Sequence, residues 1–220
     1  MAKVKTDYKW SKGCADVSVL VACECSQVVC KAFRQRGFEA YSCDIQPCYG
    51  GFPEWHIQGD ALAALYSRNW DLVIAHPPCT YLTKAGAQLL YPGGSLNSER
   101  YLKGLEARDF YMQFYNYPGR IAIENPTPCK IFDLPPYNQV IEPYMFGHPC
   151  TKRTLLWLTR LPILLATDIC IPEYSYCGSG KHSPGTSPGV RSAKLRSQTF
   201  SGVAAAMADQ WGRLLMQGVG

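Results

Sequence analysis

Several features that would mark whole classes of protein are missing from this 220-residue chain. No apolar stretch approaches the ~20 residues that a membrane-spanning helix needs, so we expect no membrane partner. The apolar run 17–23 is short and stops at Glu24, which is not the pattern of a secretory leader. The eleven cysteines lack the paired spacing of zinc ligands. We therefore expect reduced thiols, no metal and a cytoplasmic protein.

Acidic residues are also missing from one long segment. Between Tyr174 and Ala208 there is no Asp or Glu, although the net charge of the whole chain is only +5. This segment carries four cations, which are Lys181, Arg191, Lys194 and Arg196. Such a run is either a solvated loop or a surface that contacts phosphates. A base-modifying site nearby would favour the second interpretation.

The composition, with 47% hydrophobic and 18% charged residues, is that of an ordinary globular protein with one domain. Apolar runs typical of buried strands alternate with helical patterns. This alternation predicts a doubly wound, mostly parallel α/β sheet. We place the domain at residues 17–217, after a flexible basic arm at 1–16.

Apolar periodicity and turn residues predict the individual elements. Strands are expected at 17–23, 38–43, 70–75 and 121–123, with an antiparallel pair formed by 140–146 and 155–158. Helices are expected at 27–36, at 61–67 with Asp60 as its cap, from Ser98 to near Pro118, and at 203–216. The third helix is expected to bury Leu102, Leu105, Phe110 and Phe114, and the last to bury Val203, Met207 and Trp211. Residues 46–58 should form an irregular loop and 82–97 a mobile connection.

Two apolar runs end in residues that suit chemistry. The run 71–75 is followed by His76, two prolines and Cys79, and the run 121–123 is followed by Glu124. Neighbouring parallel strands would place Cys79 and Glu124 at the same carboxyl edge, where open α/β sheets bind ligands. There a thiol suits covalent attack on a ring, and a carboxylate suits control of the ring's protonation.

Each of these residues also has a structural interpretation. Cys79 could be a buried structural thiol, although its place after two prolines at the end of a strand argues against the core. Glu124 could simply cap the following turn. We interpret His76 as a structural neighbour, and Asn125 as a residue that orients the loop without touching substrate.

The order of four motifs resembles the cytosine carbon-5 DNA methyltransferases. The motifs are Pro77-Pro78-Cys79, Glu124-Asn125, Thr151-Lys152-Arg153 and the terminal run from Ser201 to Ala208. Each is weak alone, but the four in this order, over roughly residues 17–212, form a specific pattern. The resemblance implies a Rossmann-like, S-adenosylmethionine-dependent methyltransferase fold whose sheet ends in an antiparallel hairpin.

The resemblance also implies a mechanism. The Cys79 thiolate would add to carbon 6 of cytosine, which makes carbon 5 nucleophilic enough to take a methyl group. Glu124 would protonate or hydrogen-bond ring nitrogen 3 as charge builds, and Arg153 would hold the base carbonyl or the Glu124 carboxylate. A thiol with a pKa near ~8.5 needs a positive field, or the substrate itself, to ionise at neutral pH.

The donor implied by the resemblance is S-adenosylmethionine. In the family the first strand ends in a Gly-rich turn, whereas residues 22–26 of this chain contain no glycine. Side chains there would crowd the amino-acid end of the cofactor. The expected contacts are Glu24 with the methionine amine, Asp44 with the ribose hydroxyls and Asp60 with the adenine amine, together with Pro78 and with Ser26, which would also cap the following helix.

Target recognition is where the chain departs most from the family. Typical bacterial members carry a long target-recognition region, whereas here a short basic loop at 170–198 takes its place. The chain therefore resembles compact, phage-encoded members that act on single- or double-stranded DNA, as a monomer or weak dimer in a bacterial or phage-infected cytoplasm. Two alternatives stay open. One is the same chemistry on RNA, on a free pyrimidine nucleotide or with another donor; the other is a non-catalytic nucleic-acid-binding protein with a degenerate cofactor site.

Overall fold

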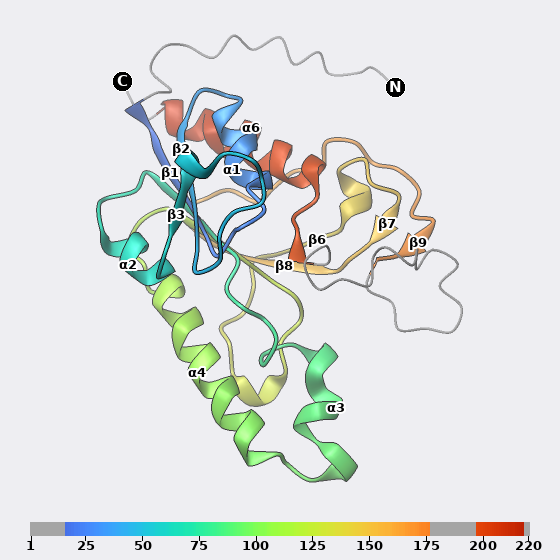
Figure 1. The fold of residues 1–220 in the computed structure, drawn as a ribbon. Coiled ribbons are helices and arrows are strands. Elements are labelled where there is room, and N and C mark those ends of the chain that lie inside the picture. The colour runs from blue at the N-terminus through green and yellow to red at the C-terminus, as the bar shows by residue number, and fades with distance from the viewer. Residues whose placement is uncertain (1–15, 177–196, 218–220) are drawn as a thin grey trace.

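A computed structural model describes residues 16–176 and 197–217. In this part of the chain a seven-stranded sheet has the order β3-β2-β1-β4-β5-β8-β6, and β7 pairs with β9 in a second, two-stranded sheet (Figure 1). The strands are β1 (Ser18–Ala22), β2 (Glu39–Asp44), β3 (His56–Gln58), β4 (Leu72–Ala75), β5 (Ile121–Asn125), β6 (Gln139–Ile141), β7 (Cys150–Thr151), β8 (Thr154–Thr159) and β9 (Tyr174–Ser175). The helices are α1 (Val28–Arg34), α2 (Ala61–Tyr66), α3 (Ala87–Leu90), α4 (Ser98–Tyr115) and α6 (Ser201–Gln217), and short 3-10 turns lie at Pro53–Trp55, Lys84–Gly86, Pro92–Gly94, Lys130–Phe132 and Pro143–Met145.

The large sheet is mostly parallel. Strands β3, β2, β1, β4 and β5 run in one direction, whereas β8 runs antiparallel between β5 and β6. This arrangement confirms the predicted doubly wound sheet with an antiparallel pair. The first strand of that pair is shorter than the predicted 140–146, because β6 ends at Ile141 and a 3-10 turn begins at Pro143. Successive strands lead outward from β1 to β3 and from β4 to β5, so the strand order reverses between β1 and β4. Ligands of such sheets bind beyond the carboxyl ends of the strands at this reversal.

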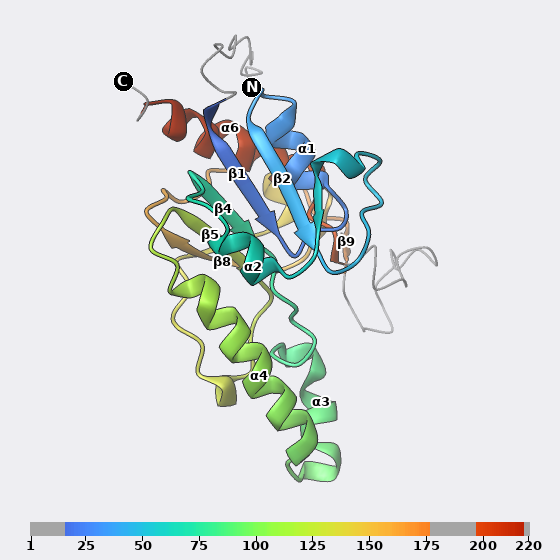
Figure 2. The ribbon, with the colours of Figure 1, turned by 60° about the vertical axis from the view of Figure 1, so that its left-hand side comes forward.

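Helices cover both faces of the sheet. α1 and α6 lie side by side on one face, and α2 and α4 cover the other (Figures 1 and 2). Every residue of β1 and of β4 is buried, because side chains of alternating direction pack under both helical layers. Burial on both faces explains why the sequences of these strands are almost continuously apolar. None of the helices in the described part of the chain is long and apolar enough for a membrane span.

The two long helices agree with the sequence to different extents. α6 buries Val203, Met207 and Trp211 on one face, as predicted. In α4, Phe114 is buried as predicted. The prediction that Leu102 is buried is wrong, because that residue is 59% exposed. The N-terminal half of α4 extends past the sheet, which leaves that end of the helix with less core to pack against (Figure 2).

The segment predicted as an irregular loop contains one more strand. Its last three residues form β3, which adds a parallel edge to the sheet by pairing His56 with Ser42. The His56 ring supports this pairing, because its Nδ1 lies 2.8 Å from the Ser42 hydroxyl. An edge strand of three residues has too short an apolar pattern to be recognised before its partner is known.

Candidate active site at the carboxyl edge of the sheet

The residues that follow β4 and β5 meet at the carboxyl edge. Parallel pairing sets Ala75 opposite Ile123, so the next residues, His76 and Glu124, leave neighbouring strands side by side. Cys79 follows in the same loop as His76. Cys79 and Glu124 therefore lie at the same edge of the sheet, as the sequence predicts. We call the residues 22–27, 76–79 and 124–126 the switch-point edge.

Hydrogen bonds fix the loops of this edge to each other. The Asn125 side-chain amide donates to the Pro77 carbonyl over 3.4 Å, which fits its predicted role in orienting the loop. The Cys79 carbonyl accepts from the amides of Leu82 and Thr83, both at 3.0 Å, and so turns the chain just after the thiol. The Cys79 side chain is half-buried, outside the core that encloses β4.

Glu124 forms a partly buried ion pair with His76. His76 Nδ1 lies 2.8 Å from Glu124 Oε2, and the two side chains are only 11% and 13% exposed. Burial opposes ionisation of Glu124, but the hydrogen bond and charge of His76, together with the charge of Lys152, hold its pKa below the ordinary value. Burial likewise disfavours charge on His76, yet Glu124 and the nearby Glu24 raise its pKa. The pair therefore favours a carboxylate beside an imidazolium.

Two buried polar atoms of this edge have no hydrogen-bond partner among the described residues. They are His76 Nε2 and Asn125 Oδ1, and in the same part of the chain only the Tyr111 hydroxyl shares this property. Buried polar atoms are nearly always paired in native proteins, so exceptions require an explanation such as a catalytic role or a bound ligand or water. A bound water, a ligand or a catalytic role would each account for two such atoms on adjacent strand ends.

Of the two basic residues 152 and 153, Lys152 is the one whose charge acts on Glu124. Lys152 lines a small cavity together with Glu124, and its charge lowers the pKa of that carboxyl. The predicted contact of Arg153 with the Glu124 carboxylate is absent from the structure, because Arg153 is exposed and its Nη2 lies 3.5 Å from the Tyr137 hydroxyl. Successive side chains of an extended segment point to opposite sides, so only one of the two can face Glu124.

The cavity beside Glu124 is small. Its volume is about 20 Å³, with Lys152, Thr154 and Phe200 among its walls, and Cys79 does not line it. A space of this size holds about one water molecule. Cys79 therefore does not share this cavity with Glu124. Lys152 and Phe200 line this cavity together, with the Lys152 ammonium 5.7 Å from the Phe200 ring centre.

The loop between β1 and α1 keeps a glycine-like backbone without glycine. Cys23 and Gln27 have φ angles of +60° and +59°, and they are two of four non-glycine residues with positive φ in the described chain. Such a conformation costs on the order of 1–3 kcal/mol for each residue and is found mainly where the surroundings enforce it. Here the Gln27 side chain exchanges two hydrogen bonds with the Phe52 backbone, at 2.7 and 3.1 Å.

Glu24 caps helix α1 instead of projecting into the loop. Its carboxylate accepts hydrogen bonds from the amides of Val29 (2.8 Å) and Cys30 (3.2 Å) and from the Ser26 hydroxyl (3.0 Å). The side chain is 5% exposed. Helix N-termini present unpaired N–H groups, and this carboxylate satisfies two of them, while its contact with a cofactor amine stays a prediction. Ser26, the predicted cap, is a weaker acceptor, at 3.4 Å from the Val28 amide.

The two other predicted cofactor acids lie next to this loop. Asp44 ends β2, and Asp60 caps α2 as predicted by accepting from the Leu62 amide over 2.9 Å. Burial, followed by the charges of Asp44 and Asp60 among others, raises the pKa of the Cys23 thiol, so the three side chains share one corner. Pro78 is exposed at the same edge. The predicted phosphate-contacting residues Lys181, Arg191, Lys194 and Arg196, most of the basic loop, and the N-terminal arm up to residue 15 lie outside the described residues.

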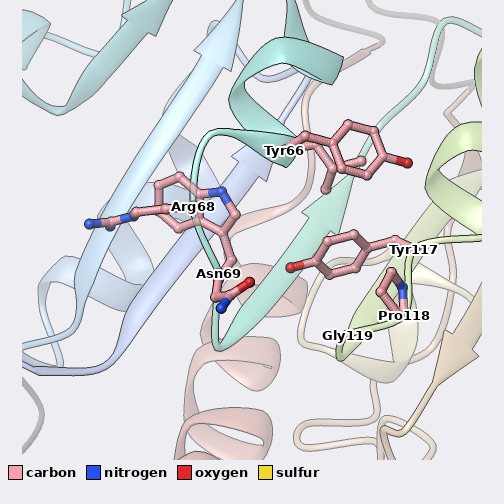
Figure 3. Close-up of a pocket in the computed structure, with 8 residues that line it drawn as sticks. Tyr66, Arg68, Asn69, Tyr117, Pro118 and Gly119 are labelled. Atoms are coloured by element: carbon pink, nitrogen blue, oxygen red, sulfur yellow. The ribbon is translucent and has the colours of Figure 1, made fainter.

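A larger groove lies at the opposite edge of the sheet. It has a volume of about 520 Å³ and opens between the segments that precede β4 and β5. Figure 3 shows the rings of Tyr66 and Tyr117 close together in it, with Arg68 extending away. Arg68 is already engaged, since its guanidinium stacks 4.0 Å over Trp70. The residues lining this groove include neither an acid nor a cysteine, and they are separate from the switch-point edge.

Comparison with known proteins adds little detail. No protein-family model matches the sequence, and no curated protein matches it either. Among solved structures, the chain is similar to a proposed DNA modification methyltransferase encoded within a prophage of E. coli. The identity is 11% and the TM-score 0.41, and the match covers 73% of this chain and 53% of that one. The chain thus spans about half the length of that protein, and the functional argument rests on its own residues.

The sequence missed two residues of the site. His76 was interpreted as a structural neighbour, and Lys152 was noted only as part of a motif. A signal for His76 existed, since an ionisable residue directly after a buried strand lies at a ligand-binding edge. No comparable signal distinguished Lys152 from Arg153, because the choice depends on which way each side chain leaves the backbone.

Proposed function

We propose that this chain transfers a methyl group from S-adenosylmethionine to carbon 5 of cytosine in DNA, through a covalent adduct with Cys79. The observation that carries the proposal is the arrangement of the switch-point edge. A half-buried thiol and a partly buried carboxylate held in its ionised state follow neighbouring parallel strands there. Ionisable groups with shifted pKa values gather at functional sites, which favours a chemical role for Glu124.

In this proposal each residue has a chemical role. Cys79 attacks carbon 6 of the ring, and Glu124 acts on ring nitrogen 3 as negative charge builds in the base. Lys152 keeps the field around Glu124 positive. Arg153, exposed near Tyr137, is available to the base carbonyl and not to Glu124. The cavity that Glu124, Lys152 and Phe200 line is no larger than a water molecule, so it does not itself hold the base.

The donor site we propose lies around the β1–α1 loop. The left-handed backbone at Cys23 and Gln27 supports it, because that conformation is what a close approach of backbone to cofactor uses. Asp44 would hold the ribose hydroxyls and Asp60 the adenine amine, with Pro78 alongside. Glu24 and Ser26 act by stabilising the loop and α1. The cofactor would supply the methyl group.

DNA is the substrate we propose, with the basic segment before α6 as the phosphate-contacting part. The stretch from Tyr174 to Ala208 supports this choice, because it contains four lysine and arginine residues and no acidic residue. Between β8 and α6 the chain leaves little length for a sequence-reading subdomain, which supports short or relaxed sequence specificity. RNA and free nucleotides carry the same ring, so they belong in the test.

The test is covalent trapping. Wild-type protein is incubated with S-adenosylmethionine and oligonucleotides that contain 5-fluorocytosine, which blocks release of the enzyme, and the adduct is located by mass spectrometry. We expect an adduct on Cys79, none with Cys79→Ser, and an unchanged yield with Cys48→Ser, a second half-buried thiol. DNA, RNA and nucleotide arms identify the substrate class. An adduct that persists in Cys79→Ser would refute the assignment of the nucleophile. No adduct and no cofactor binding would refute the enzyme itself.

A further inference from the structure

His76 is held more firmly than a residue that only fills space. Its backbone N–H donates to the Ala22 carbonyl over 3.0 Å, which fixes the end of β4 to the end of β1. Its Nδ1 meets Glu124 at 2.8 Å, and its Nε2 is buried without a partner among the described residues. A histidine used only for structure would be expected to pair both ring nitrogens.

We propose that His76 is the positioning residue of the site, holding the Glu124 carboxyl in place and supplying, through it, the proton that ring nitrogen 3 takes up when Cys79 adds. This inference rests on the function proposed above. The supporting geometry is the short contact between two side chains that adjacent strand ends bring together.

The proton and electron balance is simple. The Cys79 thiolate uses one electron pair to form the bond from sulfur to carbon 6, and the ring's double bond shifts its electrons into the ring. Ring nitrogen 3 takes a proton from the Glu124 carboxyl group, and that group has taken it from Nδ1 of the His76 imidazolium. His76 becomes neutral while Glu124 returns to a carboxylate. After carbon 5 has been methylated, a water molecule takes the proton from carbon 5, the electrons of that C–H bond form the double bond to carbon 6, and Cys79 leaves as a thiolate with the electron pair of its bond to carbon 6. The proton on nitrogen 3 returns to His76 through Glu124.

The charges that face His76 are compatible with this role. Glu124 on β5 and Glu24 in the β1–α1 loop favour the imidazolium, and Lys152, just before β8, opposes it. Burial also opposes the charged form, but the two carboxylates prevail and the pKa of His76 is raised. His76 therefore keeps its proton at a pH where an isolated imidazole would begin to lose it.

The decisive measurement is the pH dependence of covalent trapping by wild type and by His76→Asn. The Asn amide stands near the position of Nδ1 and keeps a hydrogen bond to Glu124, but it carries no titratable proton. We expect wild-type trapping to rise with pH as the thiol ionises and to fall again as His76 is deprotonated. His76→Asn should lack the falling limb and trap about 100-fold more slowly at its best pH. His76→Gln serves as a second non-ionisable variant if His76→Asn does not fold.

A double variant separates a relay through Glu124 from a general loss of structure. If His76 acts through Glu124, adding His76→Asn to Glu124→Gln should slow trapping by no more than about twofold, whereas independent effects would multiply. His56→Asn, at the remote β3 edge, controls for histidine loss. If wild type is trapped and His76→Asn shows the same pH profile of trapping, the role of His76 is overturned while the proposed function stands. Absence of trapping in wild type at every pH would overturn the proposed function.

Discussion

The cap formed by Glu24 gives a prediction that distinguishes a structural from a cofactor-binding role. The carboxylate receives two backbone N–H groups of α1 and one hydroxyl, while being 5% exposed. Hydrogen bonds to a charged group contribute about 1.5–3 kcal/mol each in net terms, and loss of a helix cap typically costs about 1 kcal/mol. These contributions are not additive, so we expect Glu24→Ala to lower the free energy of unfolding by about 2–4 kcal/mol.

Thermal unfolding followed by far-ultraviolet circular dichroism measures this loss. For a domain of this size, about 2–4 kcal/mol corresponds to a fall in the unfolding midpoint of roughly 5–15 °C. The unfolding midpoint of Glu24→Gln should fall by a smaller amount than that of Glu24→Ala. The amide oxygen of Gln still accepts a hydrogen bond, whereas its NH₂ group faces a backbone donor. Glu99→Gln is the matched control. It removes an exposed carboxylate from an i,i+4 pair with Lys103 and should leave the midpoint nearly unchanged.

The opposite pattern would refute this reasoning. If Glu24→Gln unfolds like wild type but binds S-adenosylmethionine far more weakly, measured by calorimetry, then Glu24 contacts the cofactor amine and the cap is incidental. If Glu24→Ala is as stable as Glu99→Gln, the hydrogen bonds to α1 contribute nothing measurable. Either outcome would mean that the β1–α1 loop takes another conformation in solution.

Two further predictions concern packing and pH. Gly202→Ala should destabilise the protein by about 1–3 kcal/mol in urea unfolding, because the new methyl group would collide with the Phe146 carbonyl, whereas Gly59→Ala has open space and should be neutral or slightly stabilising. The His76–Glu124 pair should stabilise most between pH 4.5 and 6.5, the ordinary pKa values of the two groups. The raised pKa of His76 gives stability that is complete below 6.5 and is lost as pH rises through its folded-state value. The lowered pKa of Glu124 gives stability that is complete above 4.5 and is lost as pH falls through its folded-state value. The difference in urea midpoint between wild type and His76→Asn should peak in that window, and a difference that is constant from pH 4 to 9 would contradict the ion pair.

The central strands could be predicted because their signal is local. The apolar runs that became β1, β4 and β5 are continuous, since helices cover both faces of the sheet. Their order along the chain then placed Cys79 and Glu124 at one edge before any coordinate was known. α6 could also be predicted from the sequence, because its buried residues recur at helical spacing.

Other features could not be read because they depend on partners that are distant in the chain. β3 exists only through pairing with β2, and Leu102 is exposed only because α4 runs past the sheet. Whether His76, Lys152 or Arg153 approaches Glu124 depends on strand register and on the direction in which each side chain leaves the backbone.

The sequence by itself determined the class of fold and the pair of strand ends where a thiol and a carboxylate lie, because apolar patterns and chain order are enough for that. Only the tertiary structure decided that Glu124 is neutralised by His76, 48 residues away, and that Glu24 is taken up by α1. The physical reason is that a buried charge is stabilised by whichever partner packing brings within hydrogen-bond distance. That partner is set by the register of β4 against β5, which appears only when the sheet is assembled.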